Sequence, residues 1–245
     1  MDIVEKHSGD IFYYELERFK KTGIVNHLFS SRIGWTTENT VENISKIFNI
    51  PKKNILYLKQ IHGNHIEIIS KNTFKDNKIV GKEGDGLITN LPNISLMTYH
   101  ADCVPIYFVD TEKKIIGLAH GGWKGSFENI SGKMVDSFIK VFDSNTRDIL
   151  TAIGPSIGPC CYEISEDLGN KFMERYMDFS DILMKKGSKV YLDLWKLNYY
   201  QLKKAGILEE NIVLSNACTS CNIDRFYSYR KEATSNRMVA AMALF

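Results

Sequence analysis

Short apolar runs that end at glycine, proline or polar turn residues are the feature that most constrains the fold of this chain. Such runs are typical of β-strands, which need few residues and are separated by turns. They predict strands over Ile55–Gln60, His65–Ser70, Ser95–Tyr99, Val104–Asp110, Ile115–His120, Ile149–Ile153, Val190–Leu192, Ile212–Leu214, Phe226–Tyr229 and Met238–Phe245.

Fewer segments place apolar residues every three or four positions, as an amphipathic helix does. Helices are predicted over Thr40–Phe48, Phe127–Phe142, Ser165–Met177 and Leu194–Ala205. Ser165 is a suitable N-cap for the third of these, and Gly206 a suitable end for the fourth. Because the strands and helices do not strictly alternate, the pattern favours the α+β class over a doubly wound sheet.

No repeat or Pro/Gly/Ser-rich linker divides the 245 residues, so one domain spanning residues 1–245 is expected. The formal net charge of +2 gives no reason to expect nucleic acid or an acidic membrane as a partner. The first residues lack the apolar segment of a signal peptide, and five cysteines are an odd number for a disulfide framework. A cytoplasmic protein with reduced thiols is therefore expected.

Three soft-metal donors stand at predicted strand ends or turns: His62, Cys103 and His120. Two imidazoles and one thiolate suit Zn²⁺, and three protein ligands leave a fourth position open. The same residues allow a second interpretation, in which Cys103 is a nucleophile and His120 its base, without a metal. His65 is expected to point away from this site, and His100 to be a partly buried histidine with its hydrogen bonds satisfied.

Four further cysteines form a vicinal pair, Cys160-Cys161, and a CxxC motif, Cys218 to Cys221. Together they offer four thiolates for a structural zinc ion. The lack of a second CxxC weakens that interpretation, and the residues after Cys221 do not predict the helix that a thioredoxin-like motif needs.

Anion binding is predicted at three cations that stand beside glycine or an aromatic residue: Arg32, Lys124 and Arg230. The chain has neither a Walker A motif nor a GxGxxG motif, so those nucleotide cradles are not expected.

Read in order, the motifs resemble the laccase-domain family of purine nucleoside phosphorylases, also labelled polyphenol oxidase, multicopper oxidoreductase or peptidoglycan editing factor. The resemblance extends from about Ser31 to the C-terminus. It rests on Gln60–Gly63, Gly84–Thr89, Ala101–Pro105, Gly117–Gly125, Ile153–Glu163, Cys218-Thr219 and Phe226–Arg230.

The resemblance implies an α+β fold of packed mixed sheets flanked by helices, similar to the catalytic domain of cytotoxic necrotising factor. It implies a zinc ion on His62, Cys103 and His120. The implied activity is phosphorolysis of adenosine, inosine and methylthioadenosine, with adenosine deamination at the same site. Purine nucleosides and phosphate are then the expected partners, and a homodimer stays open.

Within this hypothesis Asp85 and Asp102 are candidates to carry the proton, and Asp102 is alternatively a residue that orients a metal ligand. Gln60 joins the three cations as a candidate for binding substrate or phosphate. Lys124 stands where the family commonly has arginine, so the two-pronged contact to phosphate is lost there.

Two alternatives remain at this point. One is a metal-independent Cys–His hydrolase acting on an amide or ester, such as a wrongly aminoacylated peptidoglycan precursor. The other is a copper-dependent polyphenol oxidase. A four-copper oxidase does not fit, because six histidines without a His-x-His pair are too few ligands, but Cu²⁺ could replace Zn²⁺ in the single site.

Overall fold

A computed structural model describes residues 3–75 and 79–245 and contains two large β-sheets packed face to face. The first has the strand order β1-β2-β3-β15-β7-β4 and the second the order β14-β10-β8-β9-β6-β5. The strands of the first sheet are β1 (Ile3–Ser8), β2 (Ile11–Leu16), β3 (Val25–Ser30), β4 (Ile55–Leu56), β7 (Ser95–His100) and β15 (Met238–Leu244). Those of the second are β5 (Ile66–Ile69), β6 (Gly86–Thr89), β8 (Val104–Asp110), β9 (Ile115–Gly121), β10 (Ile149–Ile153) and β14 (Ile212–Leu214).

Both sheets are mixed, since most neighbours are antiparallel while β4 pairs with β7, β5 with β6, and β10 with β14 in parallel. A small third sheet, of order β11-β13-β12, extends beside the second. It contains β11 (Glu163–Ile164), β12 (Leu183–Lys186) and β13 (Lys189–Leu192).

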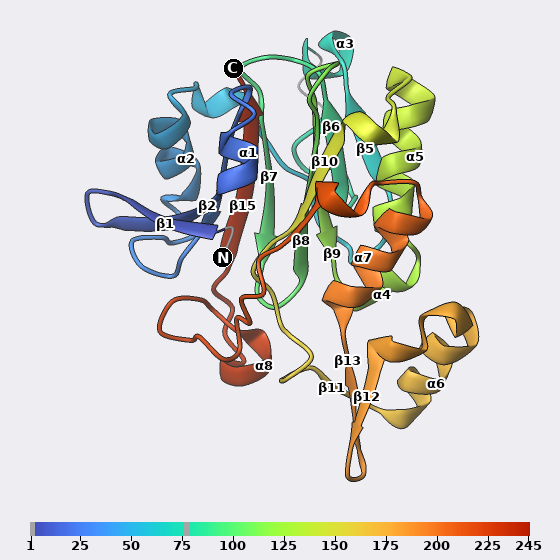
Figure 1. Cartoon of the computed structure of the whole chain (residues 1–245). Coiled ribbons are helices and arrows are strands. Elements are labelled where there is room, and N and C mark those ends of the chain that lie inside the picture. Colours follow the sequence, from blue (N-terminus) through green and yellow to red (C-terminus); the bar gives the residue numbers. More distant parts are fainter. Residues whose placement is uncertain (1–2, 76–78) are drawn as a thin grey trace.

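Helices cover the outer faces of the two large sheets (Figure 1). The helix α2 lies on the first sheet, and α4, α5 and α7 lie on the second. The helices are α1 (Glu17–Lys20), α2 (Thr40–Phe48), α3 (Lys71–Lys75), α4 (Trp123–Phe127), α5 (Ile130–Phe142), α6 (Glu166–Arg175), α7 (Leu194–Lys204) and α8 (Tyr229–Glu232). None of those in the described residues is both long and apolar enough to cross a membrane.

The central core lies between the sheets and explains the continuous apolar runs. Leu96 and Met242 of the first sheet join Tyr107 and Leu118 of the second in one buried cluster. Strands β8 and β9 are buried along their whole length because helices cover their other face, where Phe108 packs with the helix residues. This burial is typical of strands that read as unbroken hydrophobic segments.

The α+β class is confirmed, and most predicted elements are present with small shifts in their bounds. Ser165 does cap α6, since its hydroxyl accepts the backbone N–H of Leu168. The predicted helix over Phe127–Phe142 is divided, because Asn129 adopts a left-handed conformation with φ of 59° and begins α5 as its N-cap.

The predicted strand over Phe226–Tyr229 is wrong. Its apolar character comes from Phe226, which packs in the central core against Tyr14 and Phe29 from a loop rather than from a ladder. Ser228 then caps α8 by accepting the backbone N–H of Lys231.

The predicted strand over Ile55–Gln60 shortens to Ile55–Leu56, because its backbone pairing with β7 does not continue to Gln60. The Gln60 side-chain amide donates to the carbonyl of Tyr99 (2.9 Å) and accepts its N–H (2.7 Å), so a side chain replaces the backbone pairing there. The three N-terminal strands were not predicted. Strands β1 and β2 carry polar and charged residues at the sheet edge, and β3 has Asn26 and His27 within its apolar residues.

Candidate active site and metal centre

His62, Cys103 and His120 come together from three separate connections. His62 lies in the turn that follows β4, Cys103 lies between β7 and β8, and His120 belongs to β9. One donor atom from each lies within 4.8 Å of the others, and 3.9 Å separates Cys103 Sγ from His62 Nδ1. The three predicted donors therefore form one cluster.

The carboxylate of Asp85, which is 1% exposed, holds two of these residues in place. Its Oδ1 accepts the backbone N–H of His62 (3.0 Å) and the ring Nδ1 of His120 (2.8 Å). Its Oδ2 accepts the backbone N–H groups of Gly63 (2.7 Å) and Ile61 (3.3 Å). A single carboxylate thus ties the turn that carries one candidate ligand to the ring of another.

The backbone at the site adopts conformations that few side chains tolerate. His62 has φ of 59° and Asp102, directly before Cys103, has φ of 82°. Left-handed conformations at residues other than glycine cost energy and concentrate at functional sites. The hydrogen bonds to Asp85 keep His62 in its conformation and present its ring to the cluster.

The bond to Asp85 also determines which nitrogen of His120 faces the site. With Nδ1–H donating to the carboxylate, Nε2 is the nitrogen left to face Cys103, where it can serve as a metal ligand once deprotonated. Carboxylate partners of this kind commonly orient metal-binding histidines.

Charge complementarity is strong between Cys103 and His120. Burial favours the neutral forms of both, but the interaction of the pair and the Asp85 carboxylate outweigh it. The pKa of His120 is raised to about 9. For Cys103, burial is likewise outweighed by the neighbouring His120 and His62 rings, which lower the pKa of its thiol to about 6. A thiolate is the form that a metal or an electrophile requires.

Gly122 leaves the space in which these donors meet. A Cβ atom there would lie 2.9 Å from His62 Nδ1 and 3.4 Å from Cys103 Sγ. The space, two ring nitrogens and a polarised thiol fit a metal ion that prefers nitrogen and sulfur ligands. His62, Cys103 and His120 would hold it.

An open cleft of about 690 Å³ lies in front of the cluster. It is lined by Tyr57, Leu58, Lys59, Gln60, His62, Val80, Gly81, Tyr99, Ala101, Cys103, His120, Tyr229 and Arg237. The volume is in the usual range for small-molecule sites.

The four residues predicted to bind substrate or phosphate lie in different places. Gln60 lines the cleft, although both ends of its amide are already bonded to Tyr99. Lys124 lines a neighbouring hollow on the other side of His62. The three predicted cations, Arg32, Lys124 and Arg230, are not among the residues that line the cleft.

The two arginines of that set are engaged elsewhere. The Arg32 guanidinium pairs with Glu232 at 3.0 Å and lies 4.6 Å from the centre of the Tyr227 ring. The Arg230 guanidinium donates to the carbonyl of Glu163 (2.7 Å) and stacks on Tyr162.

The second predicted carboxylate, Asp102, faces away from the donor cluster. It accepts hydrogen bonds from the Thr219 hydroxyl (2.7 Å), the Ser228 hydroxyl (3.1 Å) and the backbone N–H of Arg230 (2.7 Å). The orienting contacts to the candidate ligands, which the sequence offered as an alternative role for Asp102, are made by Asp85.

The other two histidines near the cluster lie outside the donor set, and His100 is buried more deeply than expected. His100 is buried and bonds to Thr98 (2.8 Å) and to the carbonyl of Cys103 (3.0 Å), and burial lowers its pKa well below the usual value. His65 is exposed, and its ring lies 3.9 Å from Glu67.

Sequence reasoning missed most of the cleft wall. Tyr57 and Tyr99 meet edge to face with ring centres 6.0 Å apart. Lys59 and Arg237 bring positive charge, although Lys59 is paired with Glu83 at 2.9 Å.

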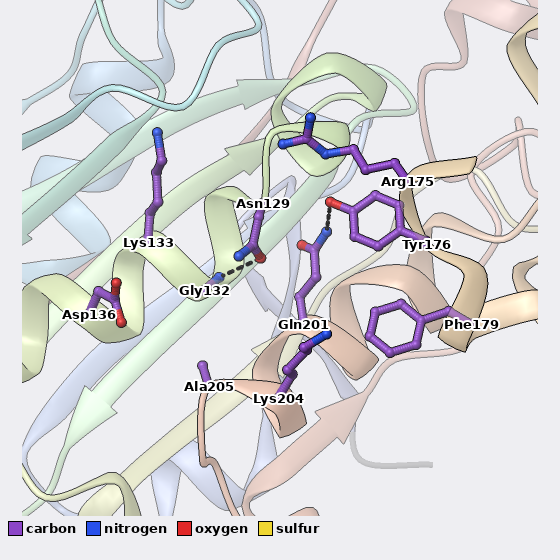
Figure 2. Close-up of a pocket in the computed structure, with 10 residues that line it drawn as sticks. All are labelled: Asn129, Gly132, Lys133, Asp136, Arg175, Tyr176, Phe179, Gln201, Lys204 and Ala205. Carbon is purple, nitrogen blue, oxygen red and sulfur yellow. Dashed lines mark hydrogen bonds between the residues drawn. The ribbon is translucent and has the colours of Figure 1, made fainter. Parts of the chain in front are cut away.

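A second hollow, of about 360 Å³, lies between α5 and α7 and next to the segment after α6 (Figure 2). It presents the cations Lys133, Arg175 and Lys204 around Tyr176, whose hydroxyl accepts a hydrogen bond from Gln201 at 2.9 Å. No histidine or cysteine lines it, so the chemistry described above belongs to the first cleft.

Comparison with known proteins agrees with this fold. The family model described as multi-copper polyphenol oxidoreductase laccase matches residues 34–245. The chain belongs to this family. In the described part of this laccase-family chain, possible metal donors gather at two places, and only one includes histidine. That set does not resemble the imidazole-rich sites that several copper ions need.

Two relatives are named for a different activity. A protein of Borreliella burgdorferi named purine nucleoside phosphorylase is 40% identical over 183 residues, which cover 73% of this chain and 75% of that protein. Purine nucleoside phosphorylase YlmD of Geobacillus stearothermophilus is 33% identical over 209 residues, covering 82% and 76%. The solved structure of YlmD from the same organism superposes with a TM-score of 0.88 at 26% identity, covering 100% and 99% of the two chains.

Proposed function

We propose that this chain is a zinc-dependent purine nucleoside phosphorylase. Its substrates would be adenosine, inosine and methylthioadenosine, which phosphate splits into the free base and ribose 1-phosphate or methylthioribose 1-phosphate. The observation that carries the proposal is the His62–Cys103–His120 cluster at one end of a cleft that also offers aromatic rings and cations. The names of the two relatives, both purine nucleoside phosphorylase, support the same activity.

The aromatic residues that line the cleft suit a purine. Tyr57, Tyr99 and Tyr229 contribute rings to its lining, and Leu58 and Val80 add apolar surface. A flat heteroaromatic base gains stacking and burial energy on such a wall. Burial raises the pKa of Tyr99 to about 12, so its hydroxyl stays protonated and can donate to a ring nitrogen.

The cations that line the cleft suit phosphate. The Arg237 guanidinium donates to the carbonyls of Thr234 (2.9 Å) and Asn236 (2.8 Å), contacts that fix its position without neutralising it. A guanidinium held in this way can bind a phosphate oxygen pair. Lys59, which pairs with Glu83, is a second cation of the cleft lining.

In phosphorolysis an oxygen of phosphate forms a bond to C1′ of the ribose while the C1′–N9 bond breaks, and its electron pair leaves with the base. When bound, zinc supplies Lewis-acid chemistry that stabilises developing negative charge. The chain contributes binding and orientation: Asp85 holds His62 and His120, His100 holds the carbonyl of Cys103, and the cleft places the two reactants together.

Adenosine deamination is proposed as a second reaction in the same cleft. Water adds at C6 of the purine and ammonia leaves, so the products are inosine and ammonia. Asp85 and Asp102 are both buried carboxylates that already accept hydrogen bonds from the protein. For Asp85 this favours a role in positioning His62 and His120 over a role in transferring the proton. We propose a cytoplasmic location, where the thiol of Cys103 remains reduced.

One observation favours a different function. The lowered pKa of Cys103 beside the raised pKa of His120 is typical of a thiolate–imidazolium pair, which attacks amides or esters without metal. This hydrolase would need Cys103 and His120 but not His62.

The discriminating experiment compares His62→Ala with His65→Ala on the purified full chain. We expect the first variant to lose the zinc ion of the His62–Cys103–His120 cluster and the phosphate-dependent release of adenine from adenosine. The control removes an exposed histidine outside the cluster and should change neither. Full activity of His62→Ala with no zinc at the remaining Cys103 and His120 would reject the metal-dependent proposal in favour of the Cys–His hydrolase.

A further inference from the structure

Four cysteines that the proposed reaction does not use lie together near the protein surface. They are Cys160, Cys161, Cys218 and Cys221, of which the first and last are exposed. Strands β10 and β14 are parallel neighbours, so the segments that follow them run side by side. A bridge between Ser156 and Cys218 continues that pairing beyond the sheet. The topology therefore brings the vicinal pair and the CxxC motif to one place.

The distances between the sulfur atoms match a shared ligand. Cys221 Sγ lies 3.5 Å from Cys160 Sγ and 3.4 Å from Cys161 Sγ. All four sulfurs lie within 4.8 Å of one another, and all four are free thiols. A tetrahedral zinc ion with Zn–S bonds of about 2.3 Å separates its sulfurs by roughly 3.8 Å. The observed spacing lies close to that value.

We propose that Cys160, Cys161, Cys218 and Cys221 bind one Zn²⁺ as a closed structural site. The four thiols lose their protons to solvent as the ion binds. Because all four positions are then occupied by protein, this ion has no open position for substrate. This site is distinct from the His62–Cys103–His120 cluster, and the two share no ligand.

The surroundings of the sulfurs support metal binding over a disulfide. The backbone N–H of Gly158 donates to Cys218 Sγ at 3.2 Å, the type of contact that stabilises metal-bound thiolates. Cys221 lies almost equally close to Cys160 and Cys161, but a disulfide could use it only once. A metal ion uses every sulfur in the cluster.

The proposed ion would also support the first site through Asp102. Thr219, next to Cys218, donates from its hydroxyl to Asp102 Oδ1 at 2.7 Å. On the other segment, the backbone N–H of Ile157 donates to the carbonyl of Asp102 at 2.9 Å. Asp102 precedes Cys103 and has the strained φ of 82°. A zinc ion that links the segments of Ile157 and Thr219 would therefore stabilise the loop between β7 and β8, which carries Cys103.

The test counts zinc on the full chain purified under reducing conditions, and repeats the count for Cys221→Ser and Cys103→Ala. We expect about two zinc ions per wild-type chain and about one in each variant. Co²⁺ then identifies the remaining site, since sulfur-to-metal charge-transfer absorption grows with the number of thiolate ligands. Cys103→Ala should keep the intense four-sulfur spectrum, and Cys221→Ser should lose it.

A chelator titration of the wild-type chain guards against variants that do not fold. Two steps of zinc release are expected, each followed by mass spectrometry of alkylated thiols. The proposal is overturned if the wild-type chain binds one zinc that Cys103→Ala abolishes. A disulfide between Cys221 and either Cys160 or Cys161, found in protein that was purified under reducing conditions and loaded with zinc, would overturn it as well.

Discussion

Replacing Asp85 by asparagine tests the idea that one buried carboxylate organises the metal centre. The side chain accepts four hydrogen bonds, three from backbone N–H groups and one from His120. An asparagine offers one acceptor oxygen and one NH₂ group in the same space. Whichever way the amide turns, one pair of donors meets another donor and loses its acceptor.

The size of the effect follows from that count. Each buried donor left without a partner costs about 1–3 kcal/mol, so the loss of two bonds is expected to lower the free energy of unfolding by about 2–6 kcal/mol. Loss of the partner that orients a metal-binding histidine usually weakens metal affinity by about 10–100-fold. Both effects should therefore appear in Asp85→Asn.

Zinc affinity measured by competition with a chelator, and unfolding measured in urea, separate the two effects. Asp102→Asn is the matched control, because it removes the same charge from a buried side chain that bonds to hydroxyls of Thr219 and Ser228. An amide there can keep its oxygen towards Ser228 and the backbone N–H of Arg230 and turn its NH₂ group to Thr219, whose hydroxyl can rotate to accept. The contacts that support the connection at Cys103 are therefore kept. Unchanged zinc affinity in Asp85→Asn, or an equal loss in Asp102→Asn, would refute the reasoning.

Three further predictions follow from particular contacts. Gly122→Ala places a Cβ 2.9 Å from His62 Nδ1, so zinc counting should show loss of the ion from a chain whose circular dichroism is unchanged. His27 accepts the N–H of Leu16 and burial lowers its pKa to about 4. Because the unfolded chain takes up the proton first, urea titrations should show about 3 kcal/mol of stability lost as the pH falls from about 6.5 to about 4, and His27→Gln should lack this loss. Arg237→Gln should raise the KM for phosphate about tenfold or more while leaving zinc content unchanged, measured by steady-state kinetics at varied phosphate; an unchanged KM would remove Arg237 from the phosphate site.

The donor cluster was predictable from the sequence because its members are chemically distinctive and stand at strand ends. His62, Cys103 and His120 are rare residue types that share one ligand chemistry. The buried strands were equally visible, since β8 and β9 read as continuous apolar runs.

The rest of the site depends on contacts that leave no local pattern. Asp85 bonds to the turn at His62 and to His120, which lie far from it along the chain. Lys59 and Arg237 meet in one cleft only because β4 and β15 both border β7. The four-cysteine cluster has the same origin, since the parallel pairing of β10 with β14 supplies the proximity that the spacing of the motifs does not suggest.

The most direct test of the proposed function follows one purified sample through loss and return of zinc. Adenosine is incubated with and without phosphate, first with the chain as purified, then after chelation, then after zinc is restored, and the products are separated by chromatography. We predict that adenine and ribose 1-phosphate form only when phosphate is present, stop forming when the ion is removed from His62, Cys103 and His120, and form again when zinc returns. Adenine release that persists without phosphate, or that is indifferent to zinc, would contradict a zinc-dependent phosphorylase.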